Sequence, residues 1–296
     1  MDKTWTIKSM LSWTTDYLTK HDDEHPRLSA EWLICAATGY SRIEVYMNID
    51  KPLTADELKI MHDGVLRRGK GEPLQYVTGE MPFRHIILKC APEVLIPRPE
   101  TEILVDEALK CIDDLRLAHK DPIHVLEVGC GTGCISCSIA SERPFTRVVA
   151  TDISPHATAL ARRNVSALGL DDRVEIIDCD LVSGVDSEME GIFDLLISNP
   201  PYIPTQVMEE LPGEVVGFEP HLALDGGDDG LDIFRRLVDV APRMLCPGGT
   251  LMVELFETKL EAAAEIIRNS QGWTEPYIVE DLTHRPRHLV ASTKPL

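Results

Sequence analysis

The sequence lacks any apolar run long enough to cross a bilayer, and its first ten residues, MDKTWTIKSM, lack the apolar stretch of a signal peptide. It also has no internal repeat and no low-complexity tract, which argues against a repeat or fibrous architecture. Hydrophobic residues make up 44% of the chain and charged residues 26%, the balance of an ordinary globular protein. We therefore expect a cytoplasmic protein with no membrane partner.

An excess of positive charge is also missing. The chain has 29 Lys and Arg against 49 Asp and Glu, a net charge of -20. Residues 1–100 hold 13 basic and 15 acidic side chains, so most of the acidic excess lies in the remainder. Because a nucleic-acid duplex attracts Lys and Arg to its phosphates, this charge argues against general DNA binding. A basic protein partner remains compatible with it.

Spacings typical of disulfide frameworks and metal sites are absent. The eight cysteines are irregularly spaced, and in a reducing compartment we expect free thiols. The histidines show no ligand spacing such as H-E-x-x-H, so we expect no metal; those considered were His85, His156, His221 and His284.

The length of 296 residues suits two domains. Residues 1–80 have mainly helical periodicity with turn signals, and residues 81–100 carry short β-like runs between prolines, so we expect a helical domain and a hairpin linker. From 101 to 296 a helix to about residue 117 precedes short apolar strands alternating with helical segments, and the last two strands form a plausible hairpin. This alternation is typical of a mostly parallel sheet built from βαβ units.

One loop has the composition of a nucleoside site. The segment VLEVGCGTGCIS, residues 125–136, places Gly129, Gly131 and Gly133 where a buried strand turns into a helix. Glycines here allow a tight turn and close approach of a ligand. Asp152 ends the next strand about 20 residues later, where an acid can accept the protons of two ribose hydroxyls. Asp180 follows the third strand and could reach an adenine amino group, or could be an exposed loop acid.

The tetrapeptide Asn199, Pro200, Pro201 and Tyr202 follows the fourth strand of this sheet, beside the glycine loop. The Asn199 side-chain carbonyl and the Pro200 main-chain carbonyl can each accept one N–H of a planar amide or amino group, and Tyr202 can pack on its plane. Such a site would orient a poorly nucleophilic nitrogen toward a methyl donor. As an alternative, N-P-P-Y is also a reasonable strand-terminating turn.

Six blocks carry a resemblance over nearly the whole chain. GEPLQYVTGE, VLIPRPETEILV, the glycine loop, TDISPHA, SNPPYI and FEPHLALDGGDDGLDIFR occur in an order that resembles the release factor glutamine methyltransferases, the PrmC/HemK family. The resemblance implies a Rossmann-like class I methyltransferase fold with a mostly parallel seven-stranded sheet and a small helical N-terminal domain. It implies methylation, by S-adenosylmethionine, of the glutamine in the Gly-Gly-Gln motif of class 1 peptide chain release factors.

The resemblance also assigns residues. The N-terminal domain would help to grip the release factor, and Asn199, Pro200, Pro201 and Tyr202 would hold its glutamine. Arg98 and residues 100–102 would lie near the cofactor entrance, although a linker with a helix N-cap at Thr101 explains them equally well. The implied cofactor contacts are Gly129, Cys130, Gly131, Thr132, Gly133, Asp152, Asp180, Leu181 and Asn199.

Some segments of the chain differ from the family's usual blocks, and other functions are compatible with parts of the sequence. Leu181 stands where this family often has an aromatic residue, and ELFETK and DLTHRPRH differ from its usual blocks. Cys130, Cys134 and Cys137 have the spacing of radical S-adenosylmethionine enzymes, but two of them fall in a predicted helix that would pack on the sheet. DNA or RNA adenine methylation is the main alternative, because an adenine amino group is equally planar. The acidic composition disfavours it, and we expect no direct nucleic-acid substrate.

Overall fold

The computed structural model describes residues 4–295, which form two compact units. Unit 1 contains residues 4–80 and 212–218, and unit 2 contains residues 81–211 and 219–295. Within the described residues, no helix combines the length and apolar character needed to cross a membrane.

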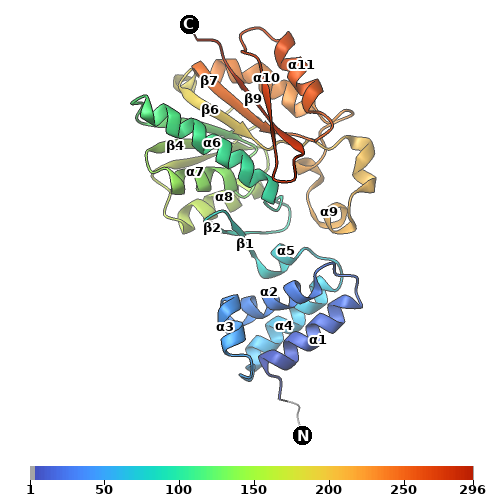
Figure 1. Ribbon diagram of the computed structural model, residues 1–296. Coiled ribbons are helices and arrows are strands. Elements are labelled where there is room, and N and C mark those ends of the chain that lie inside the picture. The colour runs from blue at the N-terminus through green and yellow to red at the C-terminus, as the bar shows by residue number, and fades with distance from the viewer. Residues whose placement is uncertain (1–3, 296) are drawn as a thin grey trace. The chain divides into compact units, whose positions relative to one another are not determined.

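Unit 1 is helical, as the periodicity of the first residues predicted (Figure 1). Three of its helices begin at a hydroxyl residue that caps the backbone, namely Thr6, Ser41 and Thr54. Gly39 ends α2 in the left-handed conformation, with φ 72°. The helices are α1 (Ile7–Thr19), α2 (Pro26–Thr38), α3 (Arg42–Met47), α4 (Ala55–Arg68), α5 (Leu74–Thr78) and α9 (Gly213–Phe218).

The α9 segment joins unit 1 although it is distant in sequence. Arg68 on α4 donates to Glu214 at 3.0 Å and to Asp23 at 2.6 Å. Asp23 and Arg68 are largely buried, so this pairing is protected from solvent. Nothing in the sequence indicated that residues 212–218 pack with unit 1 and not with the rest of residues 101–296.

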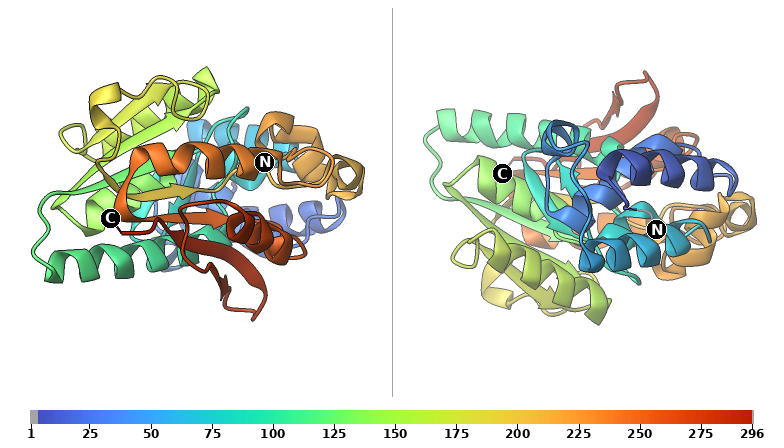
Figure 2. Two further views of the ribbon diagram at one scale, coloured as in Figure 1. Left: turned by 90° about the horizontal axis from the view of Figure 1, so that it is seen from above. Right: turned by 90° about the horizontal axis from the view of Figure 1, so that it is seen from below.

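Unit 2 contains a seven-stranded sheet with the order β5-β4-β3-β6-β7-β9-β8. The first five strands in this order are parallel, whereas β9 runs antiparallel to both β7 and β8. The predicted mostly parallel sheet and its final hairpin are therefore confirmed; Figure 2 shows the hairpin in dark red. The strands are β3 (Ile123–Val128), β4 (Thr146–Asp152), β5 (Val174–Asp178), β6 (Phe193–Ser198), β7 (Leu245–Glu254), β8 (Tyr277–Glu280) and β9 (Pro286–Ser292).

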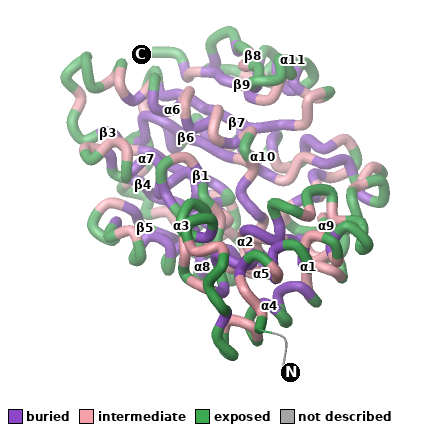
Figure 3. The backbone as a smooth tube through the Cα atoms, turned by 60° about the horizontal axis from the view of Figure 1, so that its bottom comes forward, coloured by how far each residue is buried: buried purple, intermediate pink, exposed green. Residues whose placement is uncertain are grey.

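Helices cover both faces of this sheet. One apolar cluster joins the sheet to α6 (Pro99–Leu117), α7 (Cys134–Glu142) and α8 (Pro155–Ala167), and the other joins it to α10 (Asp232–Met244) and α11 (Leu260–Asn269). Strand β6 is consequently buried along its whole length (Figure 3), and β7 is buried over residues 250–254. Helix α10 was not anticipated from the sequence. Three short 3₁₀ segments lie at Ser187–Met189, Thr205–Glu210 and His221–Ala223.

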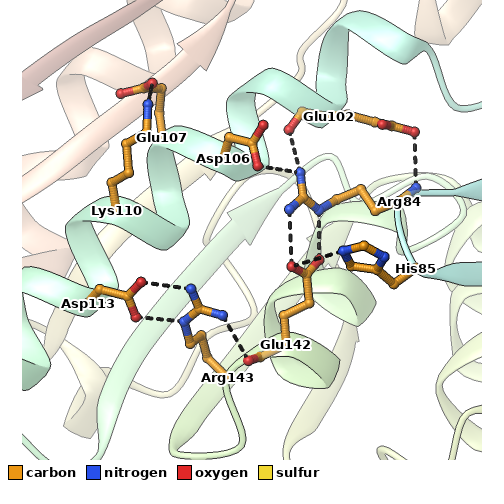
Figure 4. Close-up of polar contacts among 9 residues, drawn as sticks. All are labelled: Arg84, His85, Glu102, Asp106, Glu107, Lys110, Asp113, Glu142 and Arg143. Atoms are coloured by element: carbon orange, nitrogen blue, oxygen red, sulfur yellow. Dashed lines mark hydrogen bonds and ion pairs between the residues drawn. The ribbon is translucent and has the colours of Figure 1, made fainter.

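A two-stranded hairpin, β1 (Glu80–Phe83) and β2 (Ile86–Lys89), precedes α6. Its turn residue Arg84, with φ 50°, fastens the hairpin to two helices (Figure 4). The guanidinium donates to both carboxylate oxygens of Glu142 on α7, at 2.7 and 3.0 Å, and to Asp106 on α6 at 2.7 Å. The Arg84 backbone N–H donates to Glu102 at 3.0 Å. These bonds raise the pKa of Arg84 and connect the hairpin to unit 2, to which all its residues from Met81 on belong.

Candidate active site

A pocket of about 1020 Å³, including the space open to solvent, lies at the carboxyl ends of β3, β4 and β6. The strand order changes direction between β3 and β6, and open α/β sheets bind ligands at such a point. Of the residues proposed from the sequence, those lining the pocket are Gly129, Gly131, Asp152, Asp180, Leu181, Asn199, Pro200 and Pro201.

The glycine loop takes the turn that its composition predicted. Gly129 and Gly131 have φ values of 77° and 54°, a region in which a side chain is strained. The backbone N–H groups of Gly129 and Cys130 both donate to the Thr151 carbonyl, at 2.8 and 2.9 Å. Apart from the adjacent residues of the chain, no described residue has an atom within 4 Å of the position a Cβ would take at Gly129 or Gly131, and both glycines line the pocket.

Asp152 ends β4 and connects this strand to the glycine loop. Its Oδ2 accepts the Gly131 N–H at 2.9 Å, and its Oδ1 accepts the Ser154 N–H at 2.9 Å. Burial raises the pKa of Asp152, and these backbone N–H groups partly offset that effect. A carboxylate held at the pocket wall by two backbone bonds can still accept hydroxyl protons, so the site fits a ribose.

The pocket lining also includes an ion pair and the side chain of Leu181. Asp180 lies two residues beyond the end of β5 and accepts a bond from Arg236 on α10 at 2.6 Å. Both side chains are about half exposed, so a ligand could compete for either of them. Leu181 adopts φ 51° and contributes an aliphatic side chain to the pocket lining.

Three residues proposed as cofactor contacts do not line the pocket. Cys130 and Thr132 are each 2% exposed, and Gly133 is the N-cap of α7. Burial raises the pKa of Cys130 and Cys134 well above the usual value and that of Cys137 to about 12. Iron–sulfur clusters are bound by thiolates, so three buried, protonated thiols around the start of a helix are unsuited to hold one.

Asn199 and Pro200 lie where β6 ends, beside Gly129 at the end of the neighbouring β3. Asn199 Nδ2 donates to Thr101 Oγ1 at 3.0 Å, which leaves the amide carbonyl Oδ1 on the opposite branch. Tyr202, expected to pack on a planar substrate group, does not line the pocket. Its hydroxyl donates to Glu254 at 3.2 Å, and its ring lies 6.5 Å from that of Phe256. Burial, followed by the charge of Glu254, raises the pKa of Tyr202, so it remains a neutral donor.

The block LDGGDDG packs against the backbone of Tyr202. A Cβ at Gly226 would lie 2.7 Å from Tyr202 Cα, and one at Gly230 would lie 2.4 Å from the Tyr202 carbonyl oxygen. Ile203 also exchanges backbone bonds with this block, donating to Leu224 and accepting from Gly226. The glycines thus allow a second segment to approach the N-P-P-Y turn closely and hold it in place.

Sequence reasoning missed two groups in and behind the pocket. Arg236 lines the pocket, and Glu254 lies behind Asn199, to which it is connected through Thr101. The suggested N-cap at Thr101 is wrong, because α6 begins two residues earlier at Pro99 with Arg98 as N-cap. A signal for Glu254 was present, since it is an acid at the carboxyl end of a buried strand.

Comparison with known proteins gives two family matches and several similar proteins. Residues 9–79 match the PrmC N-terminal domain, and residues 109–211 match the methyltransferase small domain. The chain is 45% identical over 251 residues to release factor glutamine methyltransferase of Geobacter sulfurreducens, covering 85% of this chain and 84% of that protein. It is 38% identical over 288 residues to the protein of the same name from Rhodopirellula baltica, covering 97% and 96%.

Solved structures agree on the fold. The catalytic domain of human Mettl16 aligns with a TM-score of 0.54 at 15% identity, covering 80% of this chain and 81% of that one. A methyltransferase from Pyrococcus furiosus aligns with a TM-score of 0.51 at 17% identity, covering 82% and 100%. The expected class I methyltransferase fold is thereby confirmed. With a helical N-terminal unit, a glycine-lined pocket beside Asn199, and relatives this similar over most of their length, the chain belongs to the release factor glutamine methyltransferase family.

Proposed function

We propose that this chain transfers a methyl group from S-adenosylmethionine to the side-chain amide nitrogen of the glutamine in the Gly-Gly-Gln motif of class 1 release factors. The observation that carries the proposal is the position of Asn199. Its side chain borders the same pocket as Gly129 and Asp152, so a substrate amide held at Asn199 would face a nucleoside held by these two residues.

The cofactor contributes an electrophilic methyl on its sulfonium. Asp152 would accept the ribose hydroxyl protons, the backbone around Gly129 and Gly131 would border the cofactor, and Leu181 would contact the adenine with Asp180 nearby. Leu181 offers dispersion contact but no aromatic stacking. The buried Cys130, Thr132 and Gly133 would shape the loop rather than touch the ligand.

The substrate would be held by acceptors at the end of β6. A primary amide has two N–H groups and a delocalised lone pair. Asn199 Oδ1 and the Pro200 carbonyl would each accept one N–H, which fixes the plane of the amide and aims the nitrogen at the pocket. Pro200 and Pro201 stiffen the turn, so these acceptors need little reorganisation. Tyr202 would support the turn through Glu254 instead of stacking on the substrate.

The partner would be a release factor and not a nucleic acid. The net charge of -20 favours a basic protein surface over a phosphate backbone. Because release factors act on ribosomes, the proposal places this chain in the cytoplasm. The helical unit 1 is the proposed recognition domain, consistent with its match to the PrmC N-terminal domain.

The test is mass spectrometry of a class 1 release factor after incubation with cofactor and enzyme. Wild-type protein should add one methyl to the glutamine of Gly-Gly-Gln. Asn199→Ala should lower the rate about 100-fold or more while cofactor binding, measured by calorimetry, falls only a few-fold. Labelled methyl groups appearing only in added DNA or RNA would refute the proposal.

A further inference from the structure

Behind Asn199 lies a chain of hydrogen bonds that neither the cofactor nor the substrate clamp accounts for. Thr101 on α6 accepts from Asn199 Nδ2 at 3.0 Å and donates to Glu254 Oε2 at 2.8 Å. The other oxygen of Glu254, at the end of β7, accepts from Tyr202 at 3.2 Å. Two residues of the N-P-P-Y turn are therefore connected through one carboxylate.

Burial makes this chain independent of solvent. Thr101 and Glu254 are each 1% exposed. His288 lies directly opposite Glu254 on β9, and its Nε2 is 3.8 Å from Glu254 Oε2. That distance exceeds a hydrogen bond, so the Thr101 hydroxyl is the donor that satisfies Oε2.

The direction of these hydrogen bonds determines which branch of the Asn199 side-chain amide faces Thr101. A threonine hydroxyl has a single proton, and in Thr101 that proton is used by Glu254. The hydroxyl oxygen can then only accept from the Asn199 side chain, so it must face the NH₂ branch. The carbonyl branch is left for a ligand. If the Thr101 proton were free, the hydroxyl could donate to Oδ1 instead, and the amide could turn over.

We propose that Thr101 and Glu254 are positioning residues that select the orientation of the Asn199 amide in which Oδ1 accepts a substrate N–H. This inference rests on the proposed function, because it explains how that acceptor is presented. Neither residue touches substrate or cofactor; both act through Asn199, and Glu254 also fixes the hydroxyl of Tyr202.

Substitutions that keep the shape of the side chain can separate this positioning role from a purely structural one, in which the Thr101–Glu254 bond only holds α6 against β7. Thr101→Val removes the hydroxyl, and Thr101→Ser keeps it. Glu254→Gln can donate to the Thr101 oxygen, which frees the Thr101 proton and allows the Asn199 amide to turn over. Ser138→Ala is the control, because the buried Ser138 hydroxyl has no hydrogen-bond partner among the described residues.

The first measurement is steady-state kinetics with a release factor. Thr101→Val and Glu254→Gln should lower kcat about 10-fold or more with little change in the KM for cofactor, and Thr101→Ser should restore most of it. In an Asn199→Ala background, Thr101→Val should cost less than about twofold further, because its effect passes through Asn199. An equal loss in both backgrounds would mean bracing alone and would overturn the proposal.

The second measurement needs no turnover. In ¹⁵N spectra, the Asn199 side-chain amide signals, identified by their loss in Asn199→Ala, should shift in Thr101→Val and Glu254→Gln but not in Ser138→Ala. Unshifted signals would overturn the positioning role. Shifted signals in a protein that leaves release factors unmethylated would support it and contradict the proposed function alone.

Discussion

At the residue scale, the Asp152 carboxylate both stabilises the glycine loop and remains able to accept hydrogen bonds from a ligand in the pocket. The bonds from Gly131 and Ser154 use one lone pair on each carboxylate oxygen and leave others for a ligand. The carboxylate therefore belongs to the loop structure before any cofactor arrives.

The raised pKa of Asp152 predicts a pH-dependent cofactor affinity. As pH falls through this raised pKa, the carboxylate gains a proton and loses acceptor capacity. Affinity should therefore weaken on acidification, and the decrease should begin at a higher pH than it would for an ordinary aspartate. Calorimetric titration with S-adenosylmethionine over this range checks it. Asp152→Asn should bind weakly at every pH without this trend; the same slope in both proteins would contradict the assignment.

At the element scale, Arg84 connects the β1–β2 hairpin to α6 and α7, and its side chain is 9% exposed. Its partner Glu142 is 14% exposed, so the pair is shielded from water. Neighbouring Arg143 and Asp113 are 26% and 48% exposed and also form a two-pronged pair (Figure 4). The two arginines therefore allow a comparison of a more buried ion pair with a more exposed one.

Arg84→Ala should lower the free energy of unfolding by about 3 kcal/mol, because it leaves Glu142 buried without its cation. Arg143→Ala should cost at most about 1 kcal/mol, because Asp113 regains water. Urea unfolding of both variants measures the difference. Equal costs, or a larger cost for Arg143→Ala, would mean that Arg84 does not hold the hairpin.

Sequence patterns identified most of these elements for clear physical reasons. Apolar runs of strand length separated by helical periodicity allow few arrangements other than a parallel α/β sheet. Helix α10 was overlooked although Phe234, Leu237, Val238 and Ala241 all face the core. Residues 212–218 could not be assigned to unit 1, because the pairing of Glu214 with Arg68 is a contact between distant positions.

At the scale of the whole molecule, one buried acid makes stability depend on pH. Glu127 on the central strand β3 is 1% exposed and accepts from the backbone N–H of Ser136 at 3.0 Å and from its hydroxyl. Burial raises the pKa of Glu127 from 4.5 to about 8. Between pH 4.5 and about 8, the folded state therefore keeps a proton on Glu127 that the unfolded chain releases.

The stabilising contribution of Glu127 is fully present below pH 4.5 and is lost as pH rises toward about 8. The slope should be about 1.4 kcal/mol for each pH unit in this window. Because other groups titrate as well, the quantity to measure is the difference in unfolding free energy between wild type and Glu127→Gln. That difference should move in favour of the glutamine variant as pH rises. A difference that does not change with pH would contradict the assignment.

The sequence by itself determined the sheet, the glycine loop, the position of Asp152 and the turn that starts at Asn199. These features depend on local chemistry and on strand ends that meet at one edge, so order along the chain suffices to bring them together. Only the tertiary structure decided that Tyr202 points to Glu254, that Cys130 is buried, and that Thr101 holds Asn199. Each of these depends on side chains from segments that become neighbours only when helices pack on the sheet, and a pattern read along one chain carries no information about such contacts.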